Sequence, residues 1–167
     1  MRGRLFLGLL FTSLTVGNTA VLWAAHGDTT KVAADEPSIV WQASPEDAWR
    51  LMRDENRPLL LFITTDGCGY CTQMKKKTYR DAKLASEVAR SFVALRIHAE
   101  RDVDEAWLER FEVQVYPTTL IFTPDRVLAD RFNGFVAAEQ LHTRLTELVV
   151  ERAKIREVAQ REEPAPK

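Results

Sequence analysis

Cys68 and Cys71 are the only cysteines in this chain of 167 residues, and just two residues separate them. A bond between them would close a very short loop, and in the chain-entropy model a disulfide stabilises more as it encloses more residues. A disulfide between them would therefore stabilise the fold little, and an apolar core has to hold the fold together. The composition allows such a core, because 46% of the residues are hydrophobic. We expect one domain, which is typical of about 100–200 residues, that stays folded when both thiols are free.

The charge balance excludes one class of partner. Lys and Arg number 23 against 24 Asp and Glu, which gives a formal net charge of -1. Nucleic-acid-binding domains usually carry a basic face and a pI above about 9. We therefore expect no nucleic acid partner.

Residues 1–27 have the three parts of a secretory signal peptide. Two arginines begin the segment, a short apolar run follows, and the small residues Ala25 and Gly27 stand at its exit. Such a leader directs export and is removed, here after Gly27, so it is left out of the fold. The alternative is an uncleaved anchor, because residues 5–25 could nearly span a bilayer. In both cases the rest of the chain is expected to be periplasmic or otherwise extracytoplasmic, with a membrane contact only if the leader is uncleaved.

Apolar runs and capping residues predict alternating strands and helices after a flexible lead-in at 28–38. Ser44 and Asp81 are suited to cap the helices that follow them. A turn is expected at 123–126, where Pro presets the first central position. We expect strands at 39–41, 59–64, 92–97, 118–122 and 127–132, and helices at 45–54, 68–77, 82–90, 104–111 and 137–149. This order predicts an α/β fold in which a βαβ half and a ββα half share a mixed central sheet with helices on both faces.

Helical spacing also indicates which side chains face the core. We place the domain at 39–150 and treat 151–167 as a charged helical extension with a frayed tail, in which Ile155 and Val158 extend the apolar face of the last helix. The other inward residues that we expect are Ala48, Leu51, Met52, Ala106, Trp107, Phe111, Leu141, Leu145 and Leu148, with Trp41 and Trp49 as core aromatics.

The position of Cys68 at the start of a helix gives its sulfur a chemical role. Unpaired backbone N–H groups and the positive end of the helix dipole favour a thiolate there. Cys-X-X-Cys motifs at helix starts lower the pKa of the first thiol from about 8.5 to about 3.5–7.5. Cys68 is therefore the predicted nucleophile, and Cys71, one turn later, is the predicted resolving thiol. Gly69 leaves the approach open, and Tyr70 offers an aromatic face to a polypeptide substrate.

Three other interpretations of the pair compete with thiol–disulfide exchange. Structural zinc sites mostly need four ligands, and His26, His98 and His142 are not spaced as in a zinc finger, so we assign no metal ligand. A purely structural disulfide conflicts with the short loop. A redox-inactive module that binds a client, or Cu(I) through its two sulfurs, stays as the alternative function.

Over roughly 39–149 the pattern resembles the thioredoxin superfamily. The features in register are the apolar strand at 59–64, the Cys68-Gly69-Tyr70-Cys71 motif, Tyr116-Pro117-Thr118 before the hairpin, and Gly134 before the last helix. The resemblance implies a thioredoxin fold with an N-terminal strand–helix extension, no cofactor, and substrates that are proteins with cysteines. It also implies that Pro117 is cis and that Tyr116, Pro117 and Thr118 contribute, with Gly69 and Tyr70, to substrate binding.

The resemblance is incomplete around the cysteines. Thioredoxins carry a buried acid six residues before the first cysteine, and here that position is Phe62. The usual upstream tryptophans are replaced by Thr64 and Gly67, and the proline of the active-site helix by Lys76. Proton transfer from Cys71 must therefore use water or another group. Asp66 is the nearest acid, and we expect an exposed loop carboxylate that opposes thiolate formation slightly.

These observations predict an exported protein-disulfide oxidoreductase that exchanges its Cys-Gly-Tyr-Cys disulfide with protein cysteines and is recycled by a redox partner. The similarity to small exported thioredoxin-like domains linked to disulfide reduction favours a reductase. Isomerase and oxidase stay as alternatives, because direction depends on the reduction potential. We expect ordinary surface or packing roles for His98 and His142, and a solvated face for Lys75-Lys76-Lys77.

Overall fold

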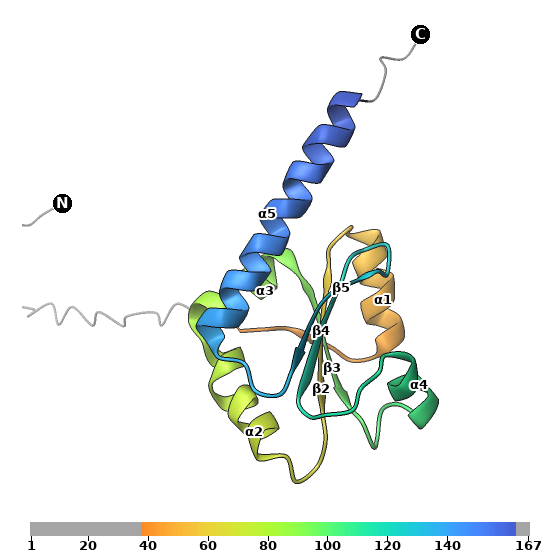
Figure 1. Cartoon of the computed structure of the whole chain (residues 1–167), viewed down its shortest axis with the longest axis vertical. Coiled ribbons are helices and arrows are strands. Elements are labelled where there is room, and N and C mark those ends of the chain that lie inside the picture. Colours follow the sequence, from red (N-terminus) through yellow and green to blue (C-terminus); the bar gives the residue numbers. More distant parts are fainter. Residues whose placement is uncertain (1–37, 163–167) are drawn as a thin grey trace, which may run out of the picture. The chain divides into compact units, whose positions relative to one another are not determined.

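The computed structural model describes residues 38–162. The leader at 1–27, nearly all of the lead-in at 28–38 and the end of the tail at 163–167 lie outside the described residues. The elements, in chain order, are β1 (Trp41–Gln42), α1 (Pro45–Asp54), β2 (Leu59–Thr64), α2 (Gly69–Lys76), the 3-10 turn η1 (Thr78–Arg80), α3 (Ala82–Ser91), β3 (Val93–His98), α4 (Glu105–Arg110), β4 (Thr118–Phe122), β5 (Leu128–Asn133) and α5 (Ala138–Glu162) (Figure 1). Among these described helices, none is long and apolar enough to cross a membrane.

The sheet has the strand order β1-β3-β2-β4-β5, with β2 at its centre. β3 runs parallel to β1 and β2, whereas β4 runs antiparallel to β2 and β5. All six residues of β2 are buried, as the continuous apolar run predicts. The register pairs Thr64 with His98 and Ile63 with Thr118. The ends of β2 and β3 and the start of β4 therefore meet at the end of the sheet from which the cysteine motif leaves.

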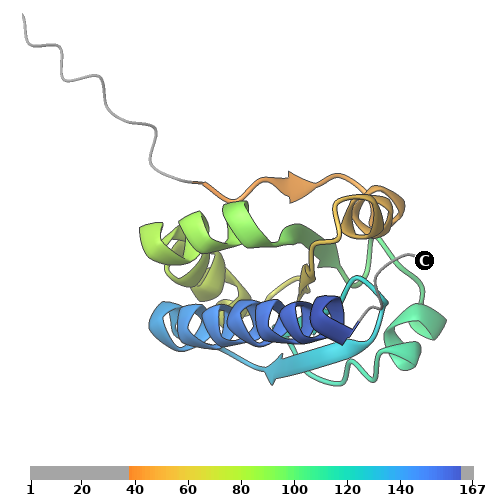
Figure 2. The ribbon, with the colours of Figure 1, turned by 90° about the horizontal axis from the view of Figure 1, so that it is seen from above.

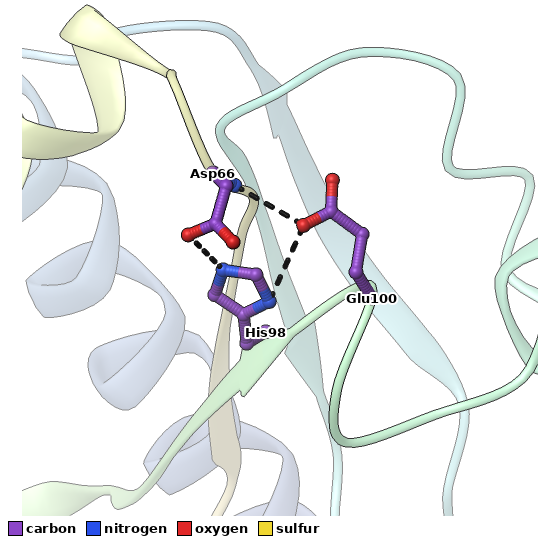
Figure 3. Close-up of side chains that lie close together, drawn as sticks. All are labelled: Asp66, His98 and Glu100. Atoms are coloured by element: carbon purple, nitrogen blue, oxygen red, sulfur yellow. Dashed lines mark hydrogen bonds and ion pairs between the residues drawn. The ribbon is translucent and has the colours of Figure 1, made fainter.

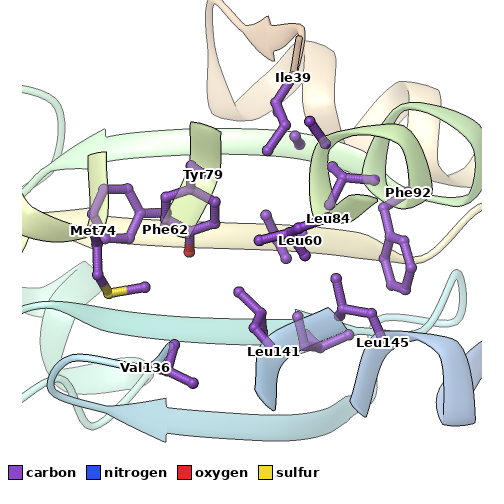
Figure 4. Packing of buried hydrophobic residues seen from close by; sticks show 14 of the residues in the cluster. Ile39, Leu60, Phe62, Met74, Tyr79, Leu84, Phe92, Val136, Leu141 and Leu145 are labelled. Atoms are coloured by element: carbon purple, nitrogen blue, oxygen red, sulfur yellow. The ribbon is translucent and has the colours of Figure 1, made fainter. Parts of the chain in front are cut away.

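Helices cover both faces of the sheet, as the α/β prediction requires. Figure 2 shows α2, α3 and α5 on one face and α1 with α4 on the other. Successive side chains of β2 point to opposite faces of the sheet, and each face has its own apolar cluster. Leu60 and Phe62 belong to the first cluster and Leu61 belongs to the second. Figure 4 shows the first cluster, in which Leu141 and Leu145 of α5 close over β2. The predicted thioredoxin fold with its N-terminal strand and helix is confirmed.

Local capping explains where the helices begin. The Ser44 side chain accepts a hydrogen bond from the Asp47 N–H at 3.1 Å, and Asp81 accepts one from the Leu84 N–H at 2.9 Å. Each bond satisfies an N–H that the first turn of a helix leaves without a partner. The predicted starts of α1 and α3 are confirmed. The first strand starts at Trp41 rather than Ile39, and β3 is shifted by one residue from 92–97.

Three predicted core positions are wrong. Ala106 is exposed, because Trp107 and Leu108 take the inward side of the short helix α4. Ile155 and Val158 are 62% and 52% exposed. Both belong to the C-terminal half of α5, where Ile155 lines a pocket beside Pro58 and Phe122 without being enclosed. Leu51 is half-buried and packs against the second cluster.

We expect Tyr79→Phe to lower the free energy of unfolding by about 1–2 kcal/mol, because it removes a buried hydrogen bond and leaves its partner unsatisfied. The Tyr79 hydroxyl lies 2.9 Å from Thr119 Oγ1, and burial raises the pKa of the Tyr79 phenol. Urea unfolding measures the loss. Tyr70→Phe is the matched control, since the Tyr70 side chain is largely exposed. Equal stability of the two variants would contradict a contribution from this bond.

Candidate active site

The two cysteines lie at the start of α2 and are joined by a disulfide. Cys68 is the N-cap residue, and its Sγ accepts the Cys71 N–H at 3.0 Å. Cys68 is half-buried, whereas Cys71 has no exposed surface. A sulfur arriving from solvent can therefore reach Cys68 and is shielded from Cys71. This unequal exposure favours Cys68 over Cys71 as the nucleophile, and the two roles stay predictions.

Cys71 belongs to the first apolar cluster, together with Met74 of the same helix. Phe62, at the position of the thioredoxin acid, is fully buried in this cluster. Its ring centroid lies 4.8 Å from that of Tyr79 and 6.2 Å from that of Trp41. An aromatic cluster therefore occupies the place where an ionisable group would be, so proton transfer needs water or another group.

The segment before β4 lies at the same end of the sheet as the motif. The Tyr116–Pro117 peptide bond is cis, which confirms that prediction. Pro117 O accepts the Gly134 N–H at 2.7 Å, and Thr118 Oγ1 donates to Val115 O at 2.7 Å. Because Thr118 pairs with Ile63 near the end of β2, the segment 116–118 lies next to the strand that leads into the cysteines.

Three exposed apolar side chains lie at this end of the sheet, one at the start of α2 and two in loops. Tyr70, Val115 and Phe135 are 63%, 45% and 39% exposed, and the Tyr70 and Phe135 ring centroids lie 6.4 Å apart. Sequence reasoning found Tyr70 and missed the other two. Their positions in the sequence could have identified them, since Val115 directly precedes Tyr116 and Phe135 directly follows Gly134.

His98 links the loop before the motif to the loop after β3, as Figure 3 shows. Its Nε2–H donates to Asp66 Oδ1 at 3.0 Å, and its Nδ1 lies 3.8 Å from Glu100 Oε2. Thr65 Oγ1 donates to Glu100 Oε1 at 2.5 Å. His98 is buried, so its role is more specific than the ordinary packing role that we expected. Sequence reasoning could not find this network, because it depends on the register of β2 and β3.

Asp66 is exposed, as expected, but it is not an isolated charge. Arg101 donates to both of its carboxylate oxygens, at 3.3 and 3.2 Å. The hydrogen bond from His98, followed by the positive charge of Arg101, lowers the pKa of Asp66 from its ordinary value. Asp66 is therefore ionised at neutral pH and is a poor acceptor for the Cys71 proton. The Arg101 charge offsets much of the repulsion that Asp66 alone would exert on a thiolate.

The same side chains form a possible set of metal ligands. One ligand atom each from Asp66, His98 and Glu100 lies within 4.8 Å of the other two. Protein donors already occupy both carboxylates, since Arg101 bonds Asp66 and Thr65 bonds Glu100. Hydrogen bonding therefore accounts for the cluster, and we assign it no metal.

Asp66→Asn should lower the thermal midpoint at pH 7 and have less effect in acid. The pKa of Asp66 is depressed in the folded state, so its stabilisation is present above the unfolded value of about 3.9 and is lost as pH falls through the folded value. Thermal melts from pH 7 to pH 3 measure the difference from the parent. Asp125→Asn is the control, because exposed Asp125 makes no ion pair in the described part of the chain. A difference in thermal midpoint that stays constant across this pH range would contradict the lowered pKa of Asp66.

A mixed five-stranded sheet, a Cys-X-X-Cys pair at a helix start and a cis-proline before β4 together define a thioredoxin-fold protein. The profile of the thioredoxin-like domain family matches residues 45–148, which is more than half of the chain. The chain belongs to this family.

Curated relatives are longer proteins of thiol–disulfide chemistry. The chain is 28% identical over 123 residues to protein disulfide-isomerase 2-3 of Arabidopsis thaliana, which covers 74% of the chain and 27% of the relative. It is 26% identical over 136 residues to the thiol:disulfide interchange protein DsbD of Yersinia pestis. This match covers 79% of the chain and 23% of the relative. The chain thus spans about a quarter of the length of these relatives.

Solved structures show the same fold at lower identity. A thioredoxin from Thermus thermophilus has a TM-score of 0.62 at 19% identity, over 68% of this chain and 89% of that one. The C-terminal domain of DsbD from Neisseria meningitidis has a TM-score of 0.52 at 18% identity, over 61% and 91%. At these identities the likeness establishes the fold alone.

Proposed function

We propose that this protein is an exported protein-disulfide oxidoreductase that acts as a reductase on disulfides of polypeptide substrates. The observation that carries the proposal is the unequal exposure of two bonded sulfurs at a helix start, with Cys68 accessible and Cys71 buried. The names of the relatives support the chemistry, since they include a disulfide isomerase and a thiol:disulfide interchange protein.

The reaction follows from this geometry. In the reduced protein, the Cys68 thiolate attacks a sulfur of the substrate disulfide, and one substrate sulfur leaves as a thiolate that takes a proton from solvent. A mixed disulfide then joins Cys68 to the substrate. Cys71 loses its proton and attacks Cys68 Sγ, which releases the second substrate thiol and forms the Cys68–Cys71 bond. Two electrons have passed to the substrate, and a dithiol redox partner must return them.

The segment 116–118 and the exposed rings form the proposed substrate surface. Tyr70 and Phe135 present apolar area to solvent, which suits a partly unfolded polypeptide better than a small polar disulfide. Tyr116, Pro117 and Thr118 contribute backbone at the start of β4, and Gly69 adds no side chain between the cysteines.

The reduction potential of the Cys68–Cys71 couple tests the direction. Thioredoxin has a potential of about −270 mV, protein disulfide isomerase about −180 mV and the oxidant DsbA about −120 mV. Equilibration with glutathione buffers gives the value, and reduction of insulin gives the activity. A potential near that of thioredoxin, with insulin turnover, supports a reductase, whereas a value above that of the isomerase excludes it. Amino-terminal sequencing of the secreted or periplasmic protein tests export and cleavage after Gly27.

A further inference from the structure

A groove beside α2 carries positive charges that thiol exchange does not use. It has a cavity volume of about 670 Å³ and lies between α2, η1 and the β1 side of the sheet. Ile39, Trp41 and Tyr79 supply its apolar surface, Ser38 and Thr72 add hydroxyls, and its cations are Lys75, Lys76, Arg80 and Arg96. We call this the cationic groove. Among residues 38–162, no acidic side chain lines it.

The four cations are not neutralised within the described part of the chain. The nine ion pairs found there involve none of them. The Arg96 guanidinium lies over the Trp41 ring, 5.9 Å from its centroid. Arg96 is also the one exposed residue of the otherwise buried strand β3. A net charge of -1 for the chain means that this concentration of positive charge is local.

The cationic groove begins close to the cysteine motif. Thr72 directly follows Cys71, and its Oγ1 donates to Cys68 O at 3.3 Å. Lys75 and Lys76 follow within the next turn of the same helix, because four residues complete about one turn. A polypeptide held at Cys68 could therefore continue along this groove.

We propose that the cationic groove binds an acidic segment, with at least one apolar side chain, of the polypeptide whose disulfide Cys68 attacks. This inference rests on the proposed function, whose substrate class it narrows. The cations come from α2, η1 and β3 rather than from one loop, and the volume is within the range of pockets that hold drug-sized ligands, so an extended segment fits better than a single small anion. The apolar surface of Ile39, Trp41 and Tyr79 would receive the apolar side chain. Exposed charge pairs contribute little individually, so the groove orients the substrate and raises its encounter rate.

Binding of a fluorescent, cysteine-free acidic peptide with a central leucine tests the proposal without any thiol chemistry. At physiological salt, we expect the double variant Lys76→Glu/Arg80→Glu to weaken binding about tenfold. The control Arg110→Glu/Lys154→Glu makes the same change in net charge at exposed residues that do not line the groove. It should weaken binding less than about twofold, because salt screens exposed charges that lie away from the bound peptide. A parent protein that binds the same peptide with amides in place of its acids equally well would overturn the proposal.

Further measurements separate the possible failures. Equal losses in the two double variants, or tighter binding of a single-stranded oligonucleotide through Lys76 and Arg80, would overturn the assignment of an acidic polypeptide. The rate of exchange with a small neutral disulfide should be the same in all variants, because such a substrate does not reach the groove. If that exchange is absent in the parent while peptide binding depends on the groove, the proposed function fails and the binding site stands.

Discussion

Cys68→Ser is expected to lower the rate of insulin reduction by at least about a thousandfold, because no other sulfur in the chain can attack a disulfide from solvent. Cys71 has no exposed surface, so it cannot replace the missing nucleophile. The expected residual rate is that of the buffer. Turnover by Cys68→Ser at the parent rate would show that the mechanism is wrong.

Cys71→Ser should behave differently, because it removes the second step and leaves the first. Cys68 still attacks the substrate, but nothing resolves the mixed disulfide. Non-reducing gels and mass spectrometry should show a covalent adduct at Cys68 that a reductant releases. Circular dichroism checks that both variants are folded, and we expect them to be, because the two apolar clusters are built mainly from other residues.

Phe62→Ala is expected to cost about 3–5 kcal/mol of unfolding free energy, the usual range for removing a buried phenylalanine. Phe62 is fully buried and packs against Tyr79 and Trp41. The loss should lower the thermal midpoint by roughly 10–20 °C. Phe135→Ala is the matched control, since Phe135 is 39% exposed, and it should change stability by less than about 0.5 kcal/mol.

A cost below about 1 kcal/mol would mean that the aromatic cluster around Phe62 does not hold the sheet to η1. The same cluster explains why the acid of other thioredoxins is not easily restored here. Phe62→Asp would remove the ring and also bury a carboxylate among Tyr79 and Trp41, where a charge without a partner is expensive.

Short-range patterns made most of the fold predictable. Ser44 and Asp81 act within one turn of the helices they cap, and the buried strand β2 is visible as an apolar run. The cysteine motif is local in the same sense, so its position at a helix start was predictable. The predictions that failed concern surfaces set by distant elements. Ala106 has helical spacing suited to the core, but the packing of Trp107 and Leu108 turns it outward.

The surroundings of the cysteines were less accessible to sequence reasoning for the same reason. His98 is far from Asp66 along the chain, and the two meet only because Thr64 pairs with His98 in the sheet. The cationic groove combines Arg96 of β3 with Lys76 of α2, and neither residue indicates the other. The run Lys75-Lys76-Lys77 is exposed throughout, as predicted, and its first two residues also line the cationic groove.

The helix α5 has 25 residues and a length of about 37 Å, and its C-terminal end extends past the sheet in Figure 1. Leu141 and Leu145 are fully buried, whereas Ile155 and Val158 are exposed. Arg152 still joins the second half to the body, since its guanidinium donates to Asn56 O and Oδ1 at 3.4 and 3.3 Å. The exposed turns after it depend on backbone bonds and on exposed pairs such as Arg161–Glu157. We therefore expect amide hydrogens in the last turns of α5 to exchange faster than those in the turns that carry Leu141 and Leu145. One continuous helix would thus join turns that open only with the whole domain to turns that open locally.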